Sequence, residues 1–403
     1  MRCSPTRPAS ATSGWSPTTC QNERVSHPQQ RVLIGALAAG VPADAHTVLL
    51  DLGVDHPTRA GLLELRLETA GGVITRARIA PGAMHRGVEK LFEVRDPRQI
   101  LMLADRHDWQ APFFGELAAV LCFEELLRLE PAPRATWLRT LLAEHTRALS
   151  HLGFLGWPVR DDPALLDRLR RAREALREQT RRLTGNRIHP MAARLGGLAC
   201  DPDADWLRAE VALTEELTAL AHALGDRFAA TRPGAGVAPV SSAQVDSFGL
   251  SGPLARAGGV PLDLRVDAPY LAYAELRELL TPAAIPGGGD AAARFALLAA
   301  ELERSAALVA ACCDALPTGP VAVKLPKIVK LPEGSAYTPI EAPLGRAGFH
   351  LVSRGGKTPW RMKLRSPSFH HVAALEQILR GCPNEEVEAA LASIGYVIGD
   401  VAK

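Results

Sequence analysis

Hydrophobic and polar positions alternate early in the chain and then take on a helical spacing. In residues 62–68 (LLELRLE), leucines alternate with charged residues, which predicts a strand with one buried face. The segment 73–79 (VITRARI) follows after a Gly-Gly pair, so the two runs predict a β-hairpin. The shorter apolar run 47–52 (TVLLDL) predicts a further strand.

Four long segments after residue 130 place apolar residues three and four positions apart, the pattern of helices that bury one face. In the second segment an aspartate pair precedes Pro163, and Asp290 precedes the fourth segment; both are typical helix starts. The expected helices cover residues 133–156, 161–183, 203–230 and 291–316.

The chain becomes richer in Pro and Gly after residue 319. Residues 348–353 (GFHLVS) and 360–366 (WRMKLRS) predict two strands joined by a Gly-Gly turn, and 387–403 predicts a helix followed by an apolar tail. The first 30 residues are rich in Ser, Thr, Pro and Arg and show no periodic pattern, which is typical of a disordered segment.

These patterns together predict an α+β protein that is mainly α. We expect a long-helix bundle with a small amino-terminal β-hairpin region and an irregular carboxy-terminal segment. The expected divisions are a disordered extension at 1–46, a small β region at 47–80, a helical bundle core at 81–318, and carboxy-terminal strands and tail at 319–403.

Composition excludes several classes of protein. The formal net charge is +2, without the basic surplus of a dedicated nucleic-acid-binding protein, so no nucleic-acid partner is expected. No run of about 18 apolar residues occurs, so a role at a membrane would need partner subunits. The seven cysteines form no C-x-x-C pair, which argues against a disulfide framework and a zinc site. The motifs of serine hydrolases, P-loop nucleotidases and dinucleotide-binding folds are absent.

Charges are concentrated in residues 82–109 (GAMHRGVEKLFEVRDPRQILMLADRHDW), beside apolar positions. Such a stretch could carry out chemistry, support chemistry in a neighbouring subunit, or face water, and its pattern leaves all three open. It contains the first two of six ordered motifs. They are HRGVEKLFE (85–93), DRHDW (105–109), AEHTRALSHLGFLG (143–156), GNRIHPMAARLGGL (185–198), LSGPLARAGGVPLDLRVDAPYLAY (250–273) and EAPLGRAGFHLVSRGGKTPWRMKLRSPSFHH (341–371).

In this order the motifs resemble the D subunit of the proton-pumping NADH:quinone oxidoreductase, complex I, a family related to the large subunit of nickel–iron hydrogenases. The resemblance covers roughly residues 47–403. It implies a peripheral subunit on the cytoplasmic side of the cell membrane, with membrane-arm and other peripheral-arm subunits as partners. It further implies a quinone chamber shared with an iron–sulfur subunit that holds a [4Fe–4S] cluster. Quinone would be the substrate, NAD(H) would bind elsewhere in the complex, and this chain's own ligands would hold no cofactor.

The resemblance assigns roles to several residues. Arg106 and His189 match positions beside the cluster, where a permanent cation and a titratable imidazole would shift its potential. Arg187 flanks His189 and is assigned to the same region, although it could equally be an ordinary salt-bridge partner. Asp161 matches an aspartate that hydrogen-bonds a quinone-site histidine, and the alternative role is to cap the helix that begins near Pro163.

The chain departs from the family pattern at both contacts to the quinone headgroup. The loop 56–61 reads HPTRAG, so Ala60 stands where the family has a histidine, and Trp109 stands where it has a tyrosine. Neither side chain is a practical proton donor for quinone reduction. We therefore assign quinone binding to Trp109 and Asp161, with His56 and Arg59 as substitutes for the lost contacts.

Two other assignments follow from the resemblance. His85, Arg86, Glu89 and Lys90 are expected to position helices and partner subunits. The segments RHDWQA and GYVIGDV, which align with the nickel-binding cysteine pairs of hydrogenases, contain no cysteine, so no metal is expected. Two hypotheses stay open: a quinone-chamber subunit with altered quinone chemistry or another acceptor, and a non-catalytic scaffold paralogue that has lost the acceptor site.

Overall fold

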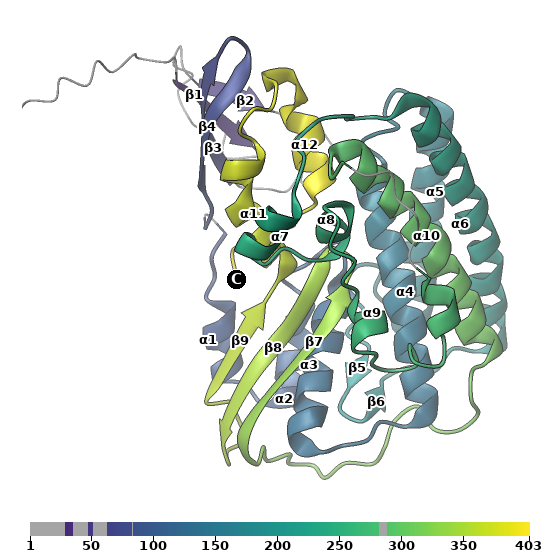
Figure 1. Cartoon of the computed structure of the whole chain (residues 1–403). Helices are drawn as coiled ribbons and strands as arrows, with labels where there is room; N and C mark the ends of the chain where they lie inside the picture. Colours follow the sequence, from purple (N-terminus) through teal and green to yellow (C-terminus); the bar gives the residue numbers. More distant parts are fainter. Residues whose placement is uncertain (1–28, 35–46, 51–62, 83, 282–287) are drawn as a thin grey trace, which may run out of the picture.

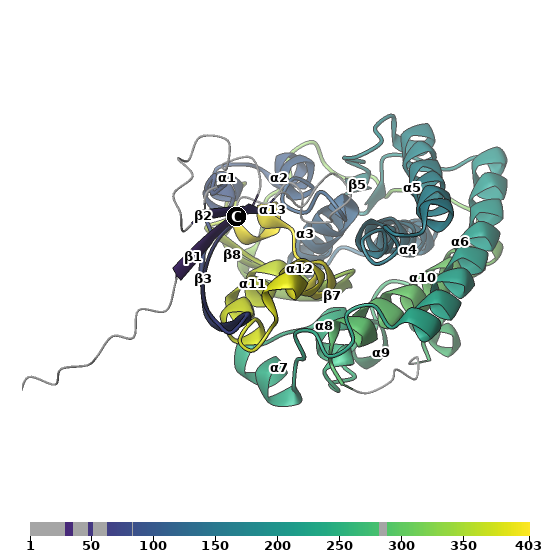
Figure 2. The ribbon, with the colours of Figure 1, turned by 90° about the horizontal axis from the view of Figure 1, so that it is seen from above.

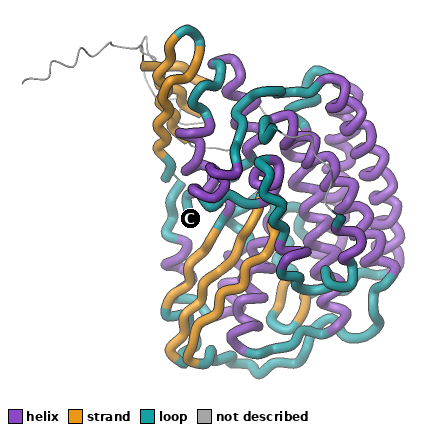
Figure 3. The backbone as a smooth tube through the Cα atoms, in the orientation of Figure 1, coloured by secondary structure: helices purple, strands orange, loops and turns teal. Residues whose placement is uncertain are grey.

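The computed structural model of this chain describes residues 29–34, 47–50, 63–82, 84–281 and 288–403 (Figure 1). Long helices form a bundle on one side of the molecule, and strands with shorter helices form the other side, as the view from above also shows (Figure 2). Helices predominate and the strands gather in small sheets (Figure 3). The expected α+β class, mainly helical, is confirmed.

The four predicted long helices are present. They are α4 (Pro133–Leu155), α5 (Pro163–Thr184), α6 (Ala204–Thr231) and α10 (Ala291–Asp314). An aspartate caps three of them: Asp162, Asp203 and Asp290 each accept a hydrogen bond from a backbone N–H in the first turn. Helix α10 packs against both α4 and α6, and α5 contacts the same two helices.

The amino-terminal sheet has the order β2-β1-β3-β4. Its strands are β1 (Gln29–Ile34), β2 (Thr47–Leu50), β3 (Leu63–Ala70) and β4 (Val73–Ala80), and β3 and β4 form the predicted hairpin. Strand β1 lies inside the segment expected to be disordered, so the structure differs from that expectation at residues 29–34. Its ladders with β2 and β3 come from tertiary pairing, which a local pattern does not reveal.

The carboxy-terminal sheet is antiparallel and contains β7 (Glu333–Ala342), β8 (Gly345–Arg354) and β9 (Arg361–Arg365). Strands β8 and β9 match the two predicted strands, whereas β7 was not predicted. Helix α3 (Pro112–Leu127) packs against β7 and β8. It is buried on almost every side and lacks an amphipathic pattern, so it also escaped prediction.

The carboxy-terminal region is more regular than expected. Shorter helices and strands surround the parts described so far. They are α1 (Val88–Glu93), α2 (Pro97–Ala104), β5 (Ala193–Arg194), β6 (Gly197–Leu198), α7 (Ser242–Phe248), α8 (Gly252–Ala257), α9 (Leu264–Asp267), η2 (Arg277–Leu280), α11 (Pro367–Ile378), η3 (Asn384–Glu386), α12 (Val387–Ile394) and α13 (Ile398–Val401). In the part of the chain described above, no helix combines the length and the apolar character needed to cross a bilayer.

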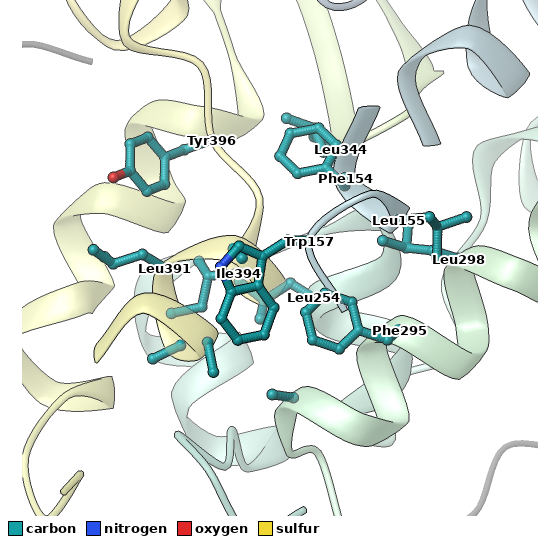
Figure 4. Packing of buried hydrophobic residues seen from close by; sticks show 14 of the residues in the cluster. Phe154, Leu155, Trp157, Leu254, Phe295, Leu298, Leu344, Leu391, Ile394 and Tyr396 are labelled. Atoms are coloured by element: carbon teal, nitrogen blue, oxygen red, sulfur yellow. The ribbon is translucent and has the colours of Figure 1, made fainter. Parts of the chain in front are cut away.

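Aromatic packing joins the bundle to the carboxy-terminal helices (Figure 4). The rings of Trp157, just after α4, and Phe295 of α10 stack with their centroids 6.0 Å apart. Ile394 of α12 and Leu254 of α8 belong to the same buried cluster. Burial of this apolar surface stabilises the contact between segments that are far apart in sequence.

A buried group of charges lies where α4, α9, α10 and β7 meet. At its centre, the carboxylate of Glu144 accepts hydrogen bonds from the hydroxyls of Tyr273 (2.6 Å) and Ser305 (2.7 Å). The guanidinium of Arg147 lies 3.1 Å from Glu144, and that of Arg265 lies 3.4 Å away. Burial alone would raise the pKa of Glu144, but the two arginines lower it to about 2, so the carboxylate is ionised.

We expect the substitution Glu144→Gln to destabilise the chain by about 3–5 kcal/mol, because it leaves the buried guanidinium of Arg147 without its ion-pair partner and removes one of the two carboxylates beside Arg265. The free energy of unfolding, measured by denaturant titration, tests this. As a control, Glu216→Gln removes a solvent-exposed partner of Arg168 and should cost no more than about 1 kcal/mol. Equal losses of unfolding free energy in the two variants would contradict the conclusion that burial makes the contacts of Glu144 important for stability.

Candidate functional site

The DRHDW motif forms the turn between α2 and α3. Helix α2 ends at Ala104, and α3 begins at Pro112, a residue suited to the first helical turn. The carboxylate of Asp108 accepts hydrogen bonds from the backbone N–H groups of Gln110 and Ala111, both at 3.0 Å. This local turn fixes the directions in which the motif's side chains leave the backbone.

Arg106 and His189 converge on Asp105, a contact that sequence reasoning did not foresee. The Nε of Arg106 lies 2.8 Å from one carboxylate oxygen of Asp105, and the Nδ1 of His189 lies 3.3 Å from the other. Asp105 is fully buried, and burial raises its pKa while the neighbouring Arg106 and His189 oppose the rise. The structure thus brings together the two residues expected beside a cluster.

Local hydrogen bonds shape the loop that carries His189. The side-chain oxygen of Asn186 accepts N–H donors from Ile188 (2.9 Å) and His189 (3.1 Å), an Asx turn. Arg187 points elsewhere and pairs with Glu174 of α5, which agrees with the salt-bridge alternative for this residue. Its assignment to the cluster region stays a prediction.

Glu116 of α3 is a second buried acid near Asp105. One of its carboxyl oxygens accepts the backbone N–H of Ala193 at 2.7 Å. Burial raises the pKa of Glu116 to about 8, and the nearby charge of Asp105 adds to the rise. Glu116 therefore holds a proton at neutral pH. Sequence reasoning missed it because it lies within a mainly apolar helix that has no amphipathic pattern.

Trp109 packs against the carboxy terminus of the chain. A Cβ atom at Gly399 of α13 would come within 2.3 Å of the indole ring, so this close approach requires glycine. The next residue, Asp400, lies with its Oδ1 2.8 Å from the Nδ1 of His107. The last residues of the chain therefore cover the DRHDW turn.

The other residues assigned to the quinone chamber are separated from this turn or lie outside the described residues. Asp161 is largely exposed and pairs with Arg227 of α6 at 2.8 Å. It does not cap α5, because Asp162 does, so the alternative role for Asp161 is wrong. His56 and Arg59, with the whole HPTRAG loop, lie outside the described residues, and their assignment stays a prediction.

The HRGVEK motif joins α1 to the carboxy-terminal sheet. Glu89 accepts hydrogen bonds from the backbone N–H of Leu364 (3.1 Å) and the side chain of Arg361 (2.9 Å), which agrees with its predicted structural role. Lys90 pairs with Glu93 at 2.8 Å on the same helix. His85 and Arg86 are exposed, so they are available to a partner.

Comparison with known proteins identifies the family. The family model of the respiratory-chain NADH dehydrogenase 49 kDa subunit matches residues 167–332 and 327–403. The chain belongs to this family.

Relatives extend the likeness over nearly the whole chain. The NADH-quinone oxidoreductase D subunit designated 2 in Salinispora tropica is 43% identical, and the alignment covers 88% of this chain and 93% of the relative. The D subunit designated 1 in Streptomyces coelicolor is 42% identical, with 90% and 97% covered. A solved structure of similar fold belongs to the membrane-bound sulfane sulfur reductase, an archaeal respiratory membrane complex. It has a TM-score of 0.77 and 29% identity, covering 85% of this chain and 95% of the other.

The family membership confirms the resemblance that the six motifs indicated. It also confirms the expected enzyme class, since the chain is a component of an oxidoreductase complex. It does not test the individual site residues. Among the described residues no three His, Cys, Asp or Glu side chains gather into a metal-binding group.

We expect Glu116→Gln to gain stability over the wild type as pH rises. The folded wild type keeps a proton on Glu116 between its ordinary pKa of 4.5 and about 8, whereas the unfolded chain releases it. The wild type therefore loses stability across this range, and the uncharged glutamine does not. Unfolding free energies of both proteins at pH 5 and pH 8 measure the difference.

Glu125→Gln is the matched control, because Glu125 is an exposed residue of the same helix. It should not reproduce the pH-dependent gain. A constant difference between Glu116→Gln and the wild type at both pH values would show that Glu116 is ionised in the folded chain.

Proposed function

We propose that this chain is the D subunit of an NADH:quinone oxidoreductase and that it supports electron transfer to quinone. In this proposal it forms the quinone chamber together with an iron–sulfur partner subunit. The observation that carries the proposal is the convergence of Arg106 and His189, from two distant motifs, on the buried carboxylate of Asp105. The names of the Salinispora and Streptomyces relatives support it.

The proposed assembly fixes where each cofactor belongs. A [4Fe–4S] cluster is held by the iron–sulfur partner, NAD(H) binds elsewhere in the complex, and this chain's own ligands hold neither. Other peripheral-arm subunits and the membrane-arm subunits complete the complex. The chain lies peripherally on the cytoplasmic side of the cell membrane, in line with the respiratory membrane complex that contains its structural neighbour.

The side chains around Asp105 suit a position beside a redox centre. Arg106 has 40% of its side chain exposed and His189 has 22%, so both reach the surface while Asp105 stays buried. A fixed cation favours the reduced state of a neighbouring cluster, and an imidazole can gain a proton when the cluster gains an electron. Asp105 orients both groups.

In the proposed chamber, Trp109, Asp161, His56 and Arg59 contact or line the quinone. Trp109 contributes an apolar face and one N–H donor but no transferable proton. The same lack of an acid at Ala60 and Trp109 favours the alternative of a non-catalytic scaffold paralogue. A different acceptor is a further candidate, because the structural neighbour belongs to a sulfane sulfur reductase.

Arg106→Ala is expected to lower the reduction potential of the partner's cluster, because the variant loses a cation that stabilises the added electron. His189→Ala should remove the pH dependence of that potential. Potentials come from redox titration of the cluster's electron paramagnetic resonance signal in the purified complex. Arg187→Ala is the control from the same loop, since Arg187 pairs with Glu174, and it should leave the potential unchanged.

Inhibitor-sensitive quinone reduction by the complex tests the function itself. We expect Arg106→Ala and Asp161→Ala each to lower turnover at least about tenfold, equivalent to about 1.4 kcal/mol of transition-state stabilisation. Asp167→Ala, which removes an exposed ion pair with Arg171 on α5, is the control. A wild-type complex with a reducible cluster and no quinone turnover would favour the scaffold or another acceptor.

A further inference from the structure

We propose that residues 321–332, which we term the basic segment, and the pocket beside them form a docking surface for another subunit of the complex. The surface fits an acid-rich stretch of that subunit that inserts one apolar side chain into the pocket. The inference rests on the proposed function, since it supposes an assembled complex, and deepens it by stating the chemistry of a partner contact. The basic segment belongs to the loop from α10 to β7, which runs along the lower edge of the molecule (Figure 1).

The basic segment carries only positive charges. Its sequence, VAVKLPKIVKLP, has a lysine at every third position from 324 to 330 and contains no acid. Lys324, Lys327 and Lys330 are exposed, and none of them forms an ion pair with another described residue. Such a group of unpaired cations attracts a negatively charged partner.

Contacts with the β5–β6 hairpin fix the start of the basic segment. The N–H of Leu198 donates to the carbonyl of Val321 at 2.9 Å, and the N–H of Val323 donates to the carbonyl of Gly196 at 3.1 Å. A Cβ atom at Gly197 would lie 2.1 Å from the carbonyl oxygen of Val321, so this close approach requires glycine. The segment therefore lies directly on the hairpin.

Arg98 of α2 and the turn between β8 and β9 hold the rest of the basic segment. The guanidinium group of Arg98 donates to the carbonyls of Pro326 and Lys327, at 2.8 and 2.5 Å. The N–H of Leu331 donates to the carbonyl of Gly356 at 2.9 Å. The lysines are thus presented from a backbone that is held at several points. Carbonyl groups have no net charge, so Arg98 keeps its positive charge at the surface.

A pocket of about 390 Å³ lies between α2, the β5–β6 hairpin and the basic segment. Apolar side chains form most of its lining, among them Met102, Leu195 and Val323. Its charged lining residues are Arg98 and Arg194. An apolar side chain that enters this pocket is removed from water, and acids beside it in the same chain would meet the arginines and the lysines.

The pocket adjoins the candidate site through Met191. The guanidinium of Arg194 donates to the carbonyl of Met191 at 2.8 Å, and a guanidinium nitrogen of Arg106 lies 3.4 Å from the sulfur of the same methionine. The docking surface is therefore continuous with the surface of Arg106, where the proposed function already places a partner subunit.

The form of the surface favours a protein segment over a nucleic acid or a lipid bilayer. An apolar pocket offers little to a phosphate group, and no aromatic ring on which a base could stack is among the described residues that line it. A bilayer would need several exposed apolar side chains beside the lysines, whereas the basic segment exposes one large apolar residue, Ile328. A chain with carboxylates and one apolar residue matches both the charges and the pocket.

Carbodiimide cross-linking of the purified complex tests the docking surface. The reagent joins a lysine amine to a carboxyl group that contacts it directly, and mass spectrometry then locates both residues. We expect Lys324, Lys327 or Lys330 to be joined to an acid-rich stretch of another subunit.

Reversing the charge of all three lysines tests their contribution to binding. The combination of Lys324→Glu, Lys327→Glu and Lys330→Glu should weaken retention of the cross-linked subunit at least about tenfold, because acids then face acids. Retention is measured as the fraction of that subunit that stays with the affinity-tagged chain as the KCl concentration rises. Reversing the cross-linked acids of the partner to lysine should restore it.

The matched control reverses three exposed arginines of α5 and α6. Arg171→Glu, Arg181→Glu and Arg208→Glu together change the net charge by the same amount and remove only solvent-exposed ion pairs. This variant should retain the subunit as the wild type does.

The apolar pocket has a test of its own. Met102→Gln makes the lining more polar and should weaken retention about fivefold, because the inserted side chain then meets a polar group. Leu103→Gln, at the next position of α2, is the control, since Leu103 does not line the pocket within the described part of the chain.

The outcomes separate the inference from the proposed function. A complex without a cross-link from these lysines to another subunit, or with retention unchanged by the triple lysine reversal, would overturn the docking surface, whereas quinone reduction tests the proposed function separately. Binding of the isolated chain to phosphatidylglycerol vesicles through these lysines, without a cross-link in the complex, would assign the surface to a membrane and overturn the inference as well. A complex that forms the cross-link but does not reduce quinone would support the docking surface and overturn the proposed acceptor chemistry.

Discussion

The pairing of Glu144 with Arg147 and Arg265 is the constraint on which the arrangement of the other elements depends. These charges come from α4 and α9, and the hydroxyl of Ser305 from α10 completes the contacts of the carboxylate. Separating α9 or α10 from α4 would remove buried contacts of this carboxylate, and contacts to a buried charge are costly to lose. The same group extends to the sheet, since Arg147 donates a hydrogen bond to the backbone carbonyl of Glu341 in β7 at 2.6 Å.

Packing contacts connect this part of the bundle to the candidate site. Strands β7 and β8 are packed against α3, and α3 begins directly after the DRHDW turn. Helices α11 and α13 close the other side, where Asp400 contacts both His107 and Ser368. The turn is thus fixed between two layers of the fold. Arg106 reaches outward from this base, with 40% of its side chain exposed.

The sequence predicted the helices and strands that bury only one face. Helix α5 alternates an apolar stripe with arginines and was expected almost to the residue, whereas α3, buried on almost every side, was not. For the site, ordered motifs identified Arg106 and His189, but nothing local indicated that both would contact Asp105. The pairing of His107 with Asp400 spans nearly the whole chain, so only the folded structure brings it into view.

The two buried sets of acids on either side of Arg106 differ in a way that bears on electron and proton transfer. Asp105 has two basic neighbours, Arg106 and His189, at the surface where a partner would dock. Asp108 has instead a second acid, Asp400, near it, and burial together with that charge raises its pKa to about 7. An electron arriving outside Arg106 would raise the proton affinity of both sets through Coulomb interaction.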